Sequence, residues 1–162
     1  MPSDQQMQQL LTTENASAAI SEQFDRDLAS ARVLVVDDEL GMRNFLQKAL
    51  RDHCAVVDTC ADTAEASARL DEHSYDVIIL DNIMPKQSGL DWLTEQKRIG
   101  LFSDAILITA YADLETAISA IRAGASDFLL KPFRSNQVLN ALGQSLARSR
   151  LRLSKTSCCG MN

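Results

Sequence analysis

The sequence predicts an α/β fold in which helices cover both faces of a doubly wound, parallel five-stranded sheet. The first observation behind this prediction is a pair of short, unbroken apolar runs at residues 33–36 and 77–80. Four residues are too few for an ordinary helix, and runs without polar alternation are typical of strands buried on both faces. The second observation is that strand-sized and helix-sized patterns alternate strictly from Arg32 to Arg150. This alternation indicates a parallel sheet between two layers of helices.

The first half of the pattern places two strands and two helices before the central strand. The strand at 33–36 is followed by a helix from about 40 to 52, because apolar residues recur there at helical spacing: Met42, Phe45, Leu46, Ala49 and Leu50. A shorter strand is expected at 55–60. Thr63 can cap the next helix, and Glu65 in its first turn is favourable for the helix dipole.

The second half begins with the central strand at 77–80, which leads into Asp81. Pro85 and Gly89 interrupt the backbone after it, so the next helix is expected from about 89 to 99. The remaining elements are expected as a strand at 104–109, a helix at 114–123, a strand at 126–130 and a last helix from about 135 towards 153.

Composition and charge limit the class of protein. The chain has 162 residues, of which 46% are hydrophobic and 23% charged, as in an ordinary globular domain with short extensions. Its formal net charge of −6 argues against direct nucleic-acid binding, which needs a basic face. No apolar run has the length of a membrane span, and no secretory signal is visible. The four cysteines show no metal-ligand spacing, so we expect reduced thiols in a cytoplasmic protein.

Three regions are expected along the chain. Residues 1–31 are expected to be a mostly mobile extension, with a short amphipathic helix at about 16–28 that would pack on the domain, on a second copy or on nothing. Residues 32–150 form the domain, and residues 151–162 form a linker or tail.

The last helix is longer than the domain needs, and its end is basic. Its apolar residues fall close to a heptad seam, and Arg148, Arg150, Arg152 and Lys155 follow. The basic end is either a solvated helix terminus or a linker helix that leads to a further domain or a dimer partner. The sequence leaves both interpretations open.

Five polar residues follow or end the expected strands. They are Asp37, Asp38, Asp81, Thr109 and Lys131. Because parallel strands end at the same edge of a sheet, these side chains are expected to converge in the crevice where open α/β sheets bind ligands. Three carboxylates in one place repel one another and raise a pKa unless a cation is bound, and Mg²⁺ suits such an oxygen-rich site. Mn²⁺ can substitute for Mg²⁺ there.

The same residues predict phosphoryl-transfer chemistry. A divalent ion, the Lys131 ammonium group and the Thr109 hydroxyl around one carboxylate are suited to the oxygens of a transferring phosphoryl group. Asp81 would be the nucleophile, and the product would be an acyl phosphate.

Four motifs resemble the receiver domain of two-component response regulators. They are Val-Val-Asp-Asp-Glu at 35–39, Leu-Asp-x-x-Met-Pro-x-x-Ser-Gly-Leu at 80–90, Thr-Ala-Tyr at 109–111 and Lys-Pro-Phe at 131–133. The resemblance covers residues 32–150 and implies a flavodoxin-like (βα)₅ fold with strand order 2-1-3-4-5. The runs at 109–117 and 123–129 look most like receivers of sigma-54-dependent, nitrogen-regulation-type activators.

The resemblance also implies a role for each site residue. Asp81 would accept phosphate from a phosphohistidine on a sensor histidine kinase or a phosphotransfer protein. Asp38 would ligate Mg²⁺ directly, Asp37 would do so through water, and Asp81 and the backbone carbonyl of Ile83 would complete the protein ligands. Lys131 would pair with the phosphoryl group, and Thr109 would donate a hydrogen bond to it.

A switch is implied at Thr109 and Phe128. The family often has a tyrosine at the position of Phe128. The phenyl ring could move inward when Thr109 moves, but it cannot donate a hydrogen bond, so such a switch would depend on packing alone. The alternative is that Phe128 is an ordinary core residue. The switch would alter the face made by the helix at 114–123, the strand at 126–130 and the last helix. That face or the last helix could support a homodimer. No membrane contact and no turnover of a separate substrate are expected.

Two alternative hypotheses compete with that of a phosphorylated receiver. A haloacid-dehalogenase-type enzyme would need a second Asp two residues after its nucleophile, but Ile83 follows Asp81 at that distance. A receiver-like module that no longer takes phosphate would be expected to lack Asp38, Asp81 or Lys131, and all three are present. The output stays open between a stand-alone receiver or phosphorelay module and part of a longer transcription activator.

Overall fold

The computed structural model describes residues 18–110 and 113–159, with side chains described up to Arg152. After an N-terminal helix at residues 18–29, strands and helices alternate along the chain. The strands are β1 (Arg32–Val36), β2 (Val56–Cys60), β3 (Val77–Asp81), β4 (Asp104–Thr109) and β5 (Asp127–Leu130). The helices are α2 (Leu40–Arg51), α3 (Thr63–Glu72), α4 (Gly89–Arg98), α5 (Leu114–Ala123) and α6 (Ser135–Cys159).

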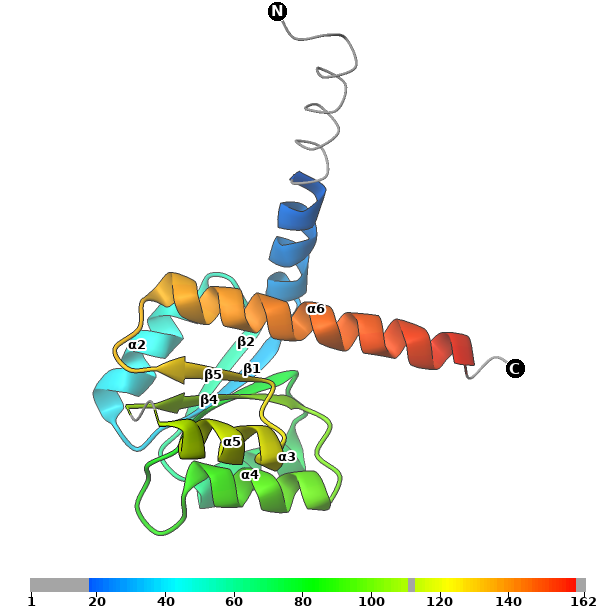
Figure 1. Cartoon of the computed structure of the whole chain (residues 1–162). Coiled ribbons are helices and arrows are strands. Elements are labelled where there is room, and N and C mark those ends of the chain that lie inside the picture. The colour runs from blue at the N-terminus through cyan, green and yellow to red at the C-terminus, as the bar shows by residue number, and fades with distance from the viewer. Residues whose placement is uncertain (1–17, 111–112, 160–162) are drawn as a thin grey trace, which may run out of the picture.

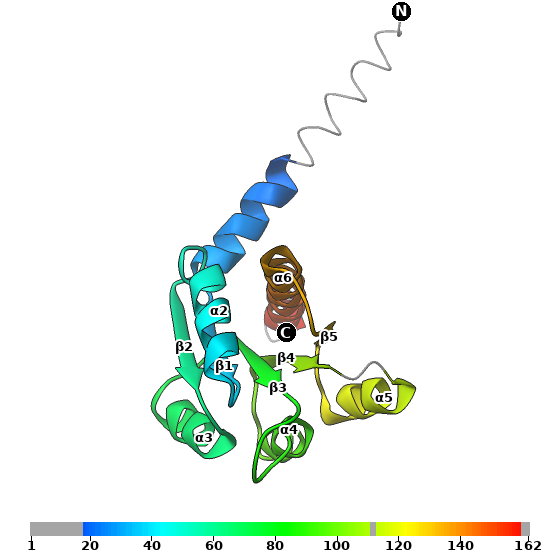
Figure 2. The same ribbon diagram turned by 90° about the vertical axis from the view of Figure 1, so that its left-hand side faces the viewer.

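The strands form one parallel sheet in the order β2-β1-β3-β4-β5, which confirms the predicted fold class (Figure 1). Figure 2 shows α2 and α6 on one face of this sheet and α3, α4 and α5 on the other. In the part of the chain that the structure describes, no helix combines the length and apolar character that a membrane span requires.

Alternate residues of each central strand enter opposite cores. In β3, Ile78 and Leu80 pack with α3, α4 and α5, whereas Val77 and Ile79 pack with α2 and α6. Every residue of β3 and β4 is buried. The unbroken apolar runs therefore report burial on both faces, as the sequence indicated.

The starts of three helices are fixed by capping side chains. Asp62, Ser88 and Asp113 accept hydrogen bonds from backbone N–H groups in the first turns of α3, α4 and α5. The predicted cap at Thr63 is wrong by one residue, because the Asp62 carboxylate accepts the bond from Glu65. The Thr63 hydroxyl instead bonds the Gln87 side chain at 3.2 Å.

The N-terminal helix packs against the domain through its last turns. Leu28, together with Ala31 just after the helix, is buried in the core that α2 and α6 form with the sheet, and Phe24 packs against the same cluster. The Phe24 ring lies over Gly143 of α6, where an added methyl group would overlap it. Figure 1 shows this helix crossing α6. Residues 1–17 of the predicted extension lie outside the described residues.

Gly143→Ala is expected to destabilise the protein although alanine is the better helix former. The methyl group displaces the Phe24 ring, which we expect to cost about 1–3 kcal/mol. In a Phe24→Ala background the obstacle is absent, so the same change should stabilise the protein by about 1 kcal/mol. Urea unfolding followed by circular dichroism measures all four proteins. Equal effects of Gly143→Ala in both backgrounds would refute this packing.

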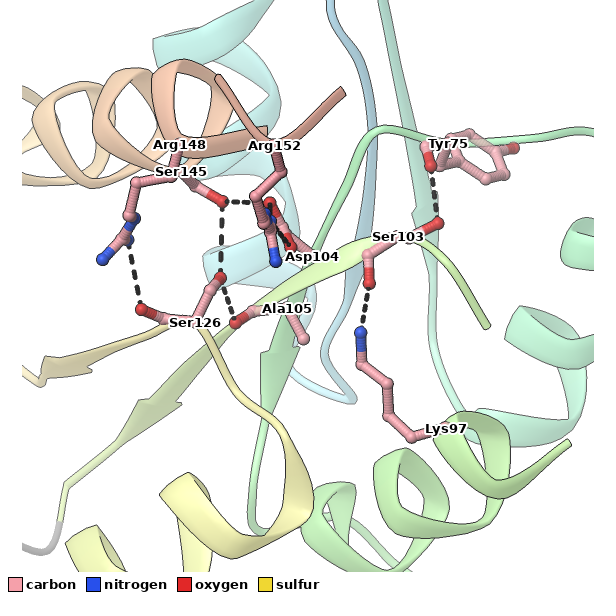
Figure 3. Close-up of polar contacts among 9 residues, drawn as sticks. All are labelled: Tyr75, Lys97, Ser103, Asp104, Ala105, Ser126, Ser145, Arg148 and Arg152. Atoms are coloured by element: carbon pink, nitrogen blue, oxygen red, sulfur yellow. Dashed lines mark hydrogen bonds and ion pairs between the residues drawn. The ribbon is translucent and has the colours of Figure 1, made fainter. Parts of the chain in front are cut away.

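The second half of α6 is fixed to the amino ends of β4 and β5 by the contacts drawn in Figure 3. Asp104, the first residue of β4, is buried, and its carboxylate accepts bonds from Arg152 at 2.8 and 3.0 Å and from Ser145 at 3.1 Å. Arg148 donates to the Ser126 carbonyl at 3.1 Å. Arg152, which the sequence assigns to a linker or tail, therefore contacts the sheet. The side chains from residue 153 onward lie outside the described residues.

Candidate functional site

The five polar residues singled out in the sequence meet at the carboxyl ends of the strands. Asp37 and Asp38 follow β1, Asp81 ends β3, Thr109 ends β4 and Lys131 follows β5. The strand registers bring these ends level, since Val36 pairs with Leu80, Asp81 with Ile108, and Thr109 with Leu130. Parallel pairing thus builds the site.

Three carboxylates and one ammonium group form the centre of the site. Carboxylate oxygens of Asp37, Asp38 and Asp81 lie within 4.8 Å of one another. The Lys131 Nζ lies 3.5 Å from Asp81 Oδ2 and 3.8 Å from Asp37 Oδ2. Asp37 and Asp81 are buried, whereas Asp38 is exposed. The site is therefore open to solvent at Asp38 and enclosed by protein at Asp37 and Asp81.

Three hydrogen bonds hold Asp37, two through its backbone and one through its carboxylate. Its N–H donates to the Cys60 carbonyl at 3.1 Å, and its Oδ1 accepts a bond from the Glu39 N–H at 2.9 Å. Its carbonyl accepts a bond from Arg43 Nη1 at 2.7 Å. Among the residues that the structure describes, none donates a hydrogen bond to the buried Oδ2 atom, whose ion pair with Lys131 Nζ is 3.8 Å long. This oxygen is therefore positioned to bind a cation.

Burial raises the pKa of both enclosed carboxyl groups. The pKa of Asp37 rises to about 6, mainly by loss of hydration, with further contributions from the charges of Asp81 and Asp38. Loss of hydration also raises the pKa of Asp81, while Lys131 and the Ile83 N–H oppose that rise. The sequence predicted raised pKa values from carboxylate repulsion, but desolvation is the larger cause.

The donor set fits a hard divalent cation. Clustered carboxylate oxygens, one of them buried without a hydrogen bond, are ligands that Mg²⁺ or Mn²⁺ accepts. A divalent ion would also offset the carboxylate charges that add to the effect of burial on these pKa values. Ile83 lies next to this centre, because its N–H donates to Asp81 Oδ1 at 3.4 Å.

The loop after β3 places Asp81 through backbone contacts that the sequence interpretation missed. Asn82 accepts bonds from the Gly89 N–H, through its carbonyl at 2.9 Å, and from the Leu90 N–H, through its side chain at 3.3 Å. A side chain at Gly89 would collide with the Asp81 carbonyl. The Ser-Gly pair in the sequence therefore reflects a close approach of α4 to the backbone of Asp81.

The predicted switch residues lie on neighbouring strands. Thr109 is fully buried, and its carbonyl accepts a bond from the Lys131 N–H at 2.8 Å. Phe128 is half-buried and packs against the core under α3, α4 and α5. The Lys131–Pro132 peptide bond is cis. A switching role for Thr109 and Phe128 stays a prediction.

Comparisons with known proteins all match this chain to response regulators or their receiver domains. The family model described as "response regulator receiver domain" matches residues 33–143. The chemotaxis protein CheY of Bacillus subtilis is 35% identical over 116 residues, which are 71% of this chain and 97% of CheY.

Longer regulators match over the same region. The transcriptional regulatory protein ZraR of Klebsiella oxytoca is 30% identical over 119 residues, 74% of this chain but 27% of ZraR. The structure of NtrX from Brucella abortus superposes with a TM-score of 0.73 at 30% identity, covering 80% of this chain and 29% of NtrX. The chain thus spans nearly all of CheY and about a quarter of the longer proteins.

Proposed function

The chain belongs to the response regulator receiver domain family, and we propose on this premise that it is a phosphorylation-dependent switch whose phosphoacceptor is Asp81. The observation that carries the proposal is the position of the Asp81 carboxylate, 3.5 Å from the Lys131 ammonium group and beside two further carboxylates. It acts as a signalling switch and does not turn over a separate substrate.

Asp81 is suited to attack a phosphohistidine of a sensor histidine kinase or a phosphotransfer protein. A carboxylate oxygen of Asp81 bonds to phosphorus as the phosphorus–nitrogen bond breaks, and the imidazole leaves with the electron pair and takes up a proton. The product is an acyl phosphate. The nucleophile must be ionised, so the nearby Lys131 charge, which lowers the pKa of Asp81, favours the reactive form.

Lys131 and Thr109 are proposed to hold the phosphoryl oxygens. The Lys131 ammonium group contacts Asp37 and Asp81, and from there it can pair with negative charge on a group attached to Asp81. Thr109 ends the neighbouring strand and can donate its hydroxyl hydrogen to a phosphoryl oxygen.

Asp38, Asp37, Asp81 and the Ile83 carbonyl are proposed to hold Mg²⁺, with Asp37 acting through water. The cation supplies charge neutralisation for the phosphoryl oxygens. The buried Oδ2 of Asp37, which accepts no hydrogen bond from the described residues, supports this assignment. Mn²⁺ is expected to substitute.

A homodimer is proposed through the face made by α5, β5 and α6. Leu114, Ile118 and Ile121 follow helical spacing along α5 and are exposed, as is Leu130 on β5. Such an apolar stripe is typical of an interaction surface. Movement of Thr109 and Phe128 would change this face, which lies beside the strands that carry them. Direct nucleic-acid binding is not proposed for this cytoplasmic domain.

The output is proposed to be transcription control through a longer activator of the sigma-54-dependent type. The sequence motifs at 109–117 and 123–129 and the matches to regulators of greater length support this reading. A second candidate is a stand-alone receiver or phosphorelay module that acts by protein contacts alone. The match over 97% of CheY favours that candidate.

Beryllofluoride, which mimics the phosphoryl group, tests the proposal. With Mg²⁺ it is expected to produce saturable changes in the amide NMR signals of Asp81, Thr109 and Lys131, and to increase the molecular mass in solution. Lys131→Met should abolish the saturation, whereas the matched change Lys48→Met, at an exposed lysine in the last turn of α2, should leave it intact. No Mg²⁺-dependent response in the unmodified protein would refute the switch.

A further inference from the structure

The start of α2 differs from the starts of α3, α4 and α5. α3, α4 and α5 each have a capping side chain and an acidic residue in the first turn. α2 has neither: Glu39 makes no side-chain capping bond, and no acidic residue occupies the first turn. Arg43, the fourth residue of α2, instead places a cation near the positive end of the helix dipole, which is locally unfavourable. When a residue opposes the local preference of a helix beside a functional site, a contact with a distant part of the chain often accounts for it.

Arg43 makes such a contact, with the backbone of Asp37. The half-buried side chain reaches back six residues, and its Nη1 donates a 2.7 Å hydrogen bond to the carbonyl oxygen of Asp37. This carbonyl belongs to the peptide unit that joins Asp37 to Asp38. The Glu39 N–H holds Asp37 Oδ1 in the same turn. Hydrogen bonds to the carbonyl oxygen and to Oδ1 of Asp37 therefore restrain the turn that carries two of the three carboxylates.

Restraint of this turn is needed because its carboxylates repel one another. Without a cation, rotation of the Asp37–Asp38 peptide unit would let the two side chains separate and become better hydrated. A hydrogen bond from a permanently charged guanidinium group opposes that rotation, and charge-assisted bonds are stronger than neutral ones.

We propose that Arg43 is a positioning residue for the divalent cation, because it holds the Asp37 carbonyl and so keeps Asp37 and Asp38 in the arrangement that binds the ion. The inference rests on the proposed function of the acidic site and assigns to it a residue outside the ligand set. Arg43 acts through the turn and does not touch the ion.

The charge of Arg43 and its hydrogen bond have opposite effects on cation affinity. A positive charge close to the site repels a divalent ion, so its removal by itself would strengthen Mg²⁺ binding. Loss of a partner that orients metal ligands weakens metal binding, typically by about 10–100-fold. Arg43→Met removes both features and keeps an unbranched side chain, so the sign of its effect identifies the dominant role.

Amide NMR titration of the full chain with MgCl₂ provides the measurement, with the signals of Asp38 and Glu39 as probes. Arg43→Met is expected to weaken Mg²⁺ binding about tenfold. Arg43→Lys keeps a charged donor and should stay close to the unmodified protein. Arg51→Met, an exposed arginine in the last turn of the same helix, removes the same charge and should leave the affinity unchanged.

Hydrogen exchange without metal gives a second readout. The Glu39 amide, which donates to Asp37 Oδ1, should exchange faster in Arg43→Met, while the amides of β3 keep their protection. Unchanged or tighter Mg²⁺ binding by Arg43→Met would overturn this inference and leave the proposed function standing. Absence of Mg²⁺ binding by the unmodified protein would overturn both.

Discussion

Asp81→Asn is expected to abolish phosphoryl uptake. The amide is not a nucleophile comparable to the carboxylate, so no acyl phosphate can form at this position. Phosphorylation by acetyl phosphate with Mg²⁺, followed by intact-protein mass spectrometry, should show one added phosphoryl group on the unmodified chain and less than about one hundredth of that rate on the variant.

The control for this experiment is Asp71→Asn, a change at an exposed carboxylate on α3. That variant should be phosphorylated at the unmodified rate. Uptake by Asp81→Asn at an undiminished rate would mean that another group, such as the exposed Asp38, accepts the phosphate, and the assignment of Asp81 would be wrong.

Asp37→Asn is expected to stabilise the metal-free protein while preventing Mg²⁺ binding. Burial raises the pKa of Asp37 from 3.8 to about 6, so the folded state holds this proton more tightly than the unfolded state. The stability that Asp37 contributes is therefore fully present below about pH 4 and is lost as the pH rises through 6. Since one pKa unit corresponds to 1.36 kcal/mol, the loss amounts to at most about 3 kcal/mol.

The neutral amide introduced by Asp37→Asn removes this penalty and can still accept the Glu39 N–H bond. The stability difference between Asp37→Asn and the unmodified chain should be small near pH 4 and should grow to about 2–3 kcal/mol by pH 7.5, as measured by urea unfolding in EDTA. Saturating Mg²⁺ should raise the melting temperature of the unmodified protein at pH 7.5 and leave the variant unchanged.

The exposed Asp52→Asn variant controls for the change in net charge and should show no such pH dependence. A difference that is constant from pH 4 to pH 7.5 would show that the Asp37 carboxyl group is not desolvated in the metal-free protein. That result would also weaken the case for a cation at its Oδ2 atom, which accepts no hydrogen bond from the described residues.

Much of the candidate site could be predicted because its residues are tied to strand ends. The apolar runs of β1 and β3 indicated where each strand stops, and parallel pairing brings those ends to one edge. Asp37, Asp81 and Lys131 therefore lie together as expected. The relative burial of Asp37 and Asp38, which are adjacent in sequence, was not predictable, because it depends on the packing around the turn.

The sequence by itself determined the order of strands and helices and the edge at which polar residues gather, since periodicity and chain polarity are local properties of the sequence. Only the tertiary structure decided which side chains from distant segments meet. Phe24 fits over Gly143, Arg152 reaches Asp104, and Arg43 turns back to the Asp37 carbonyl. These contacts depend on how far each long side chain reaches once the helices have packed, and no period in the sequence records that distance.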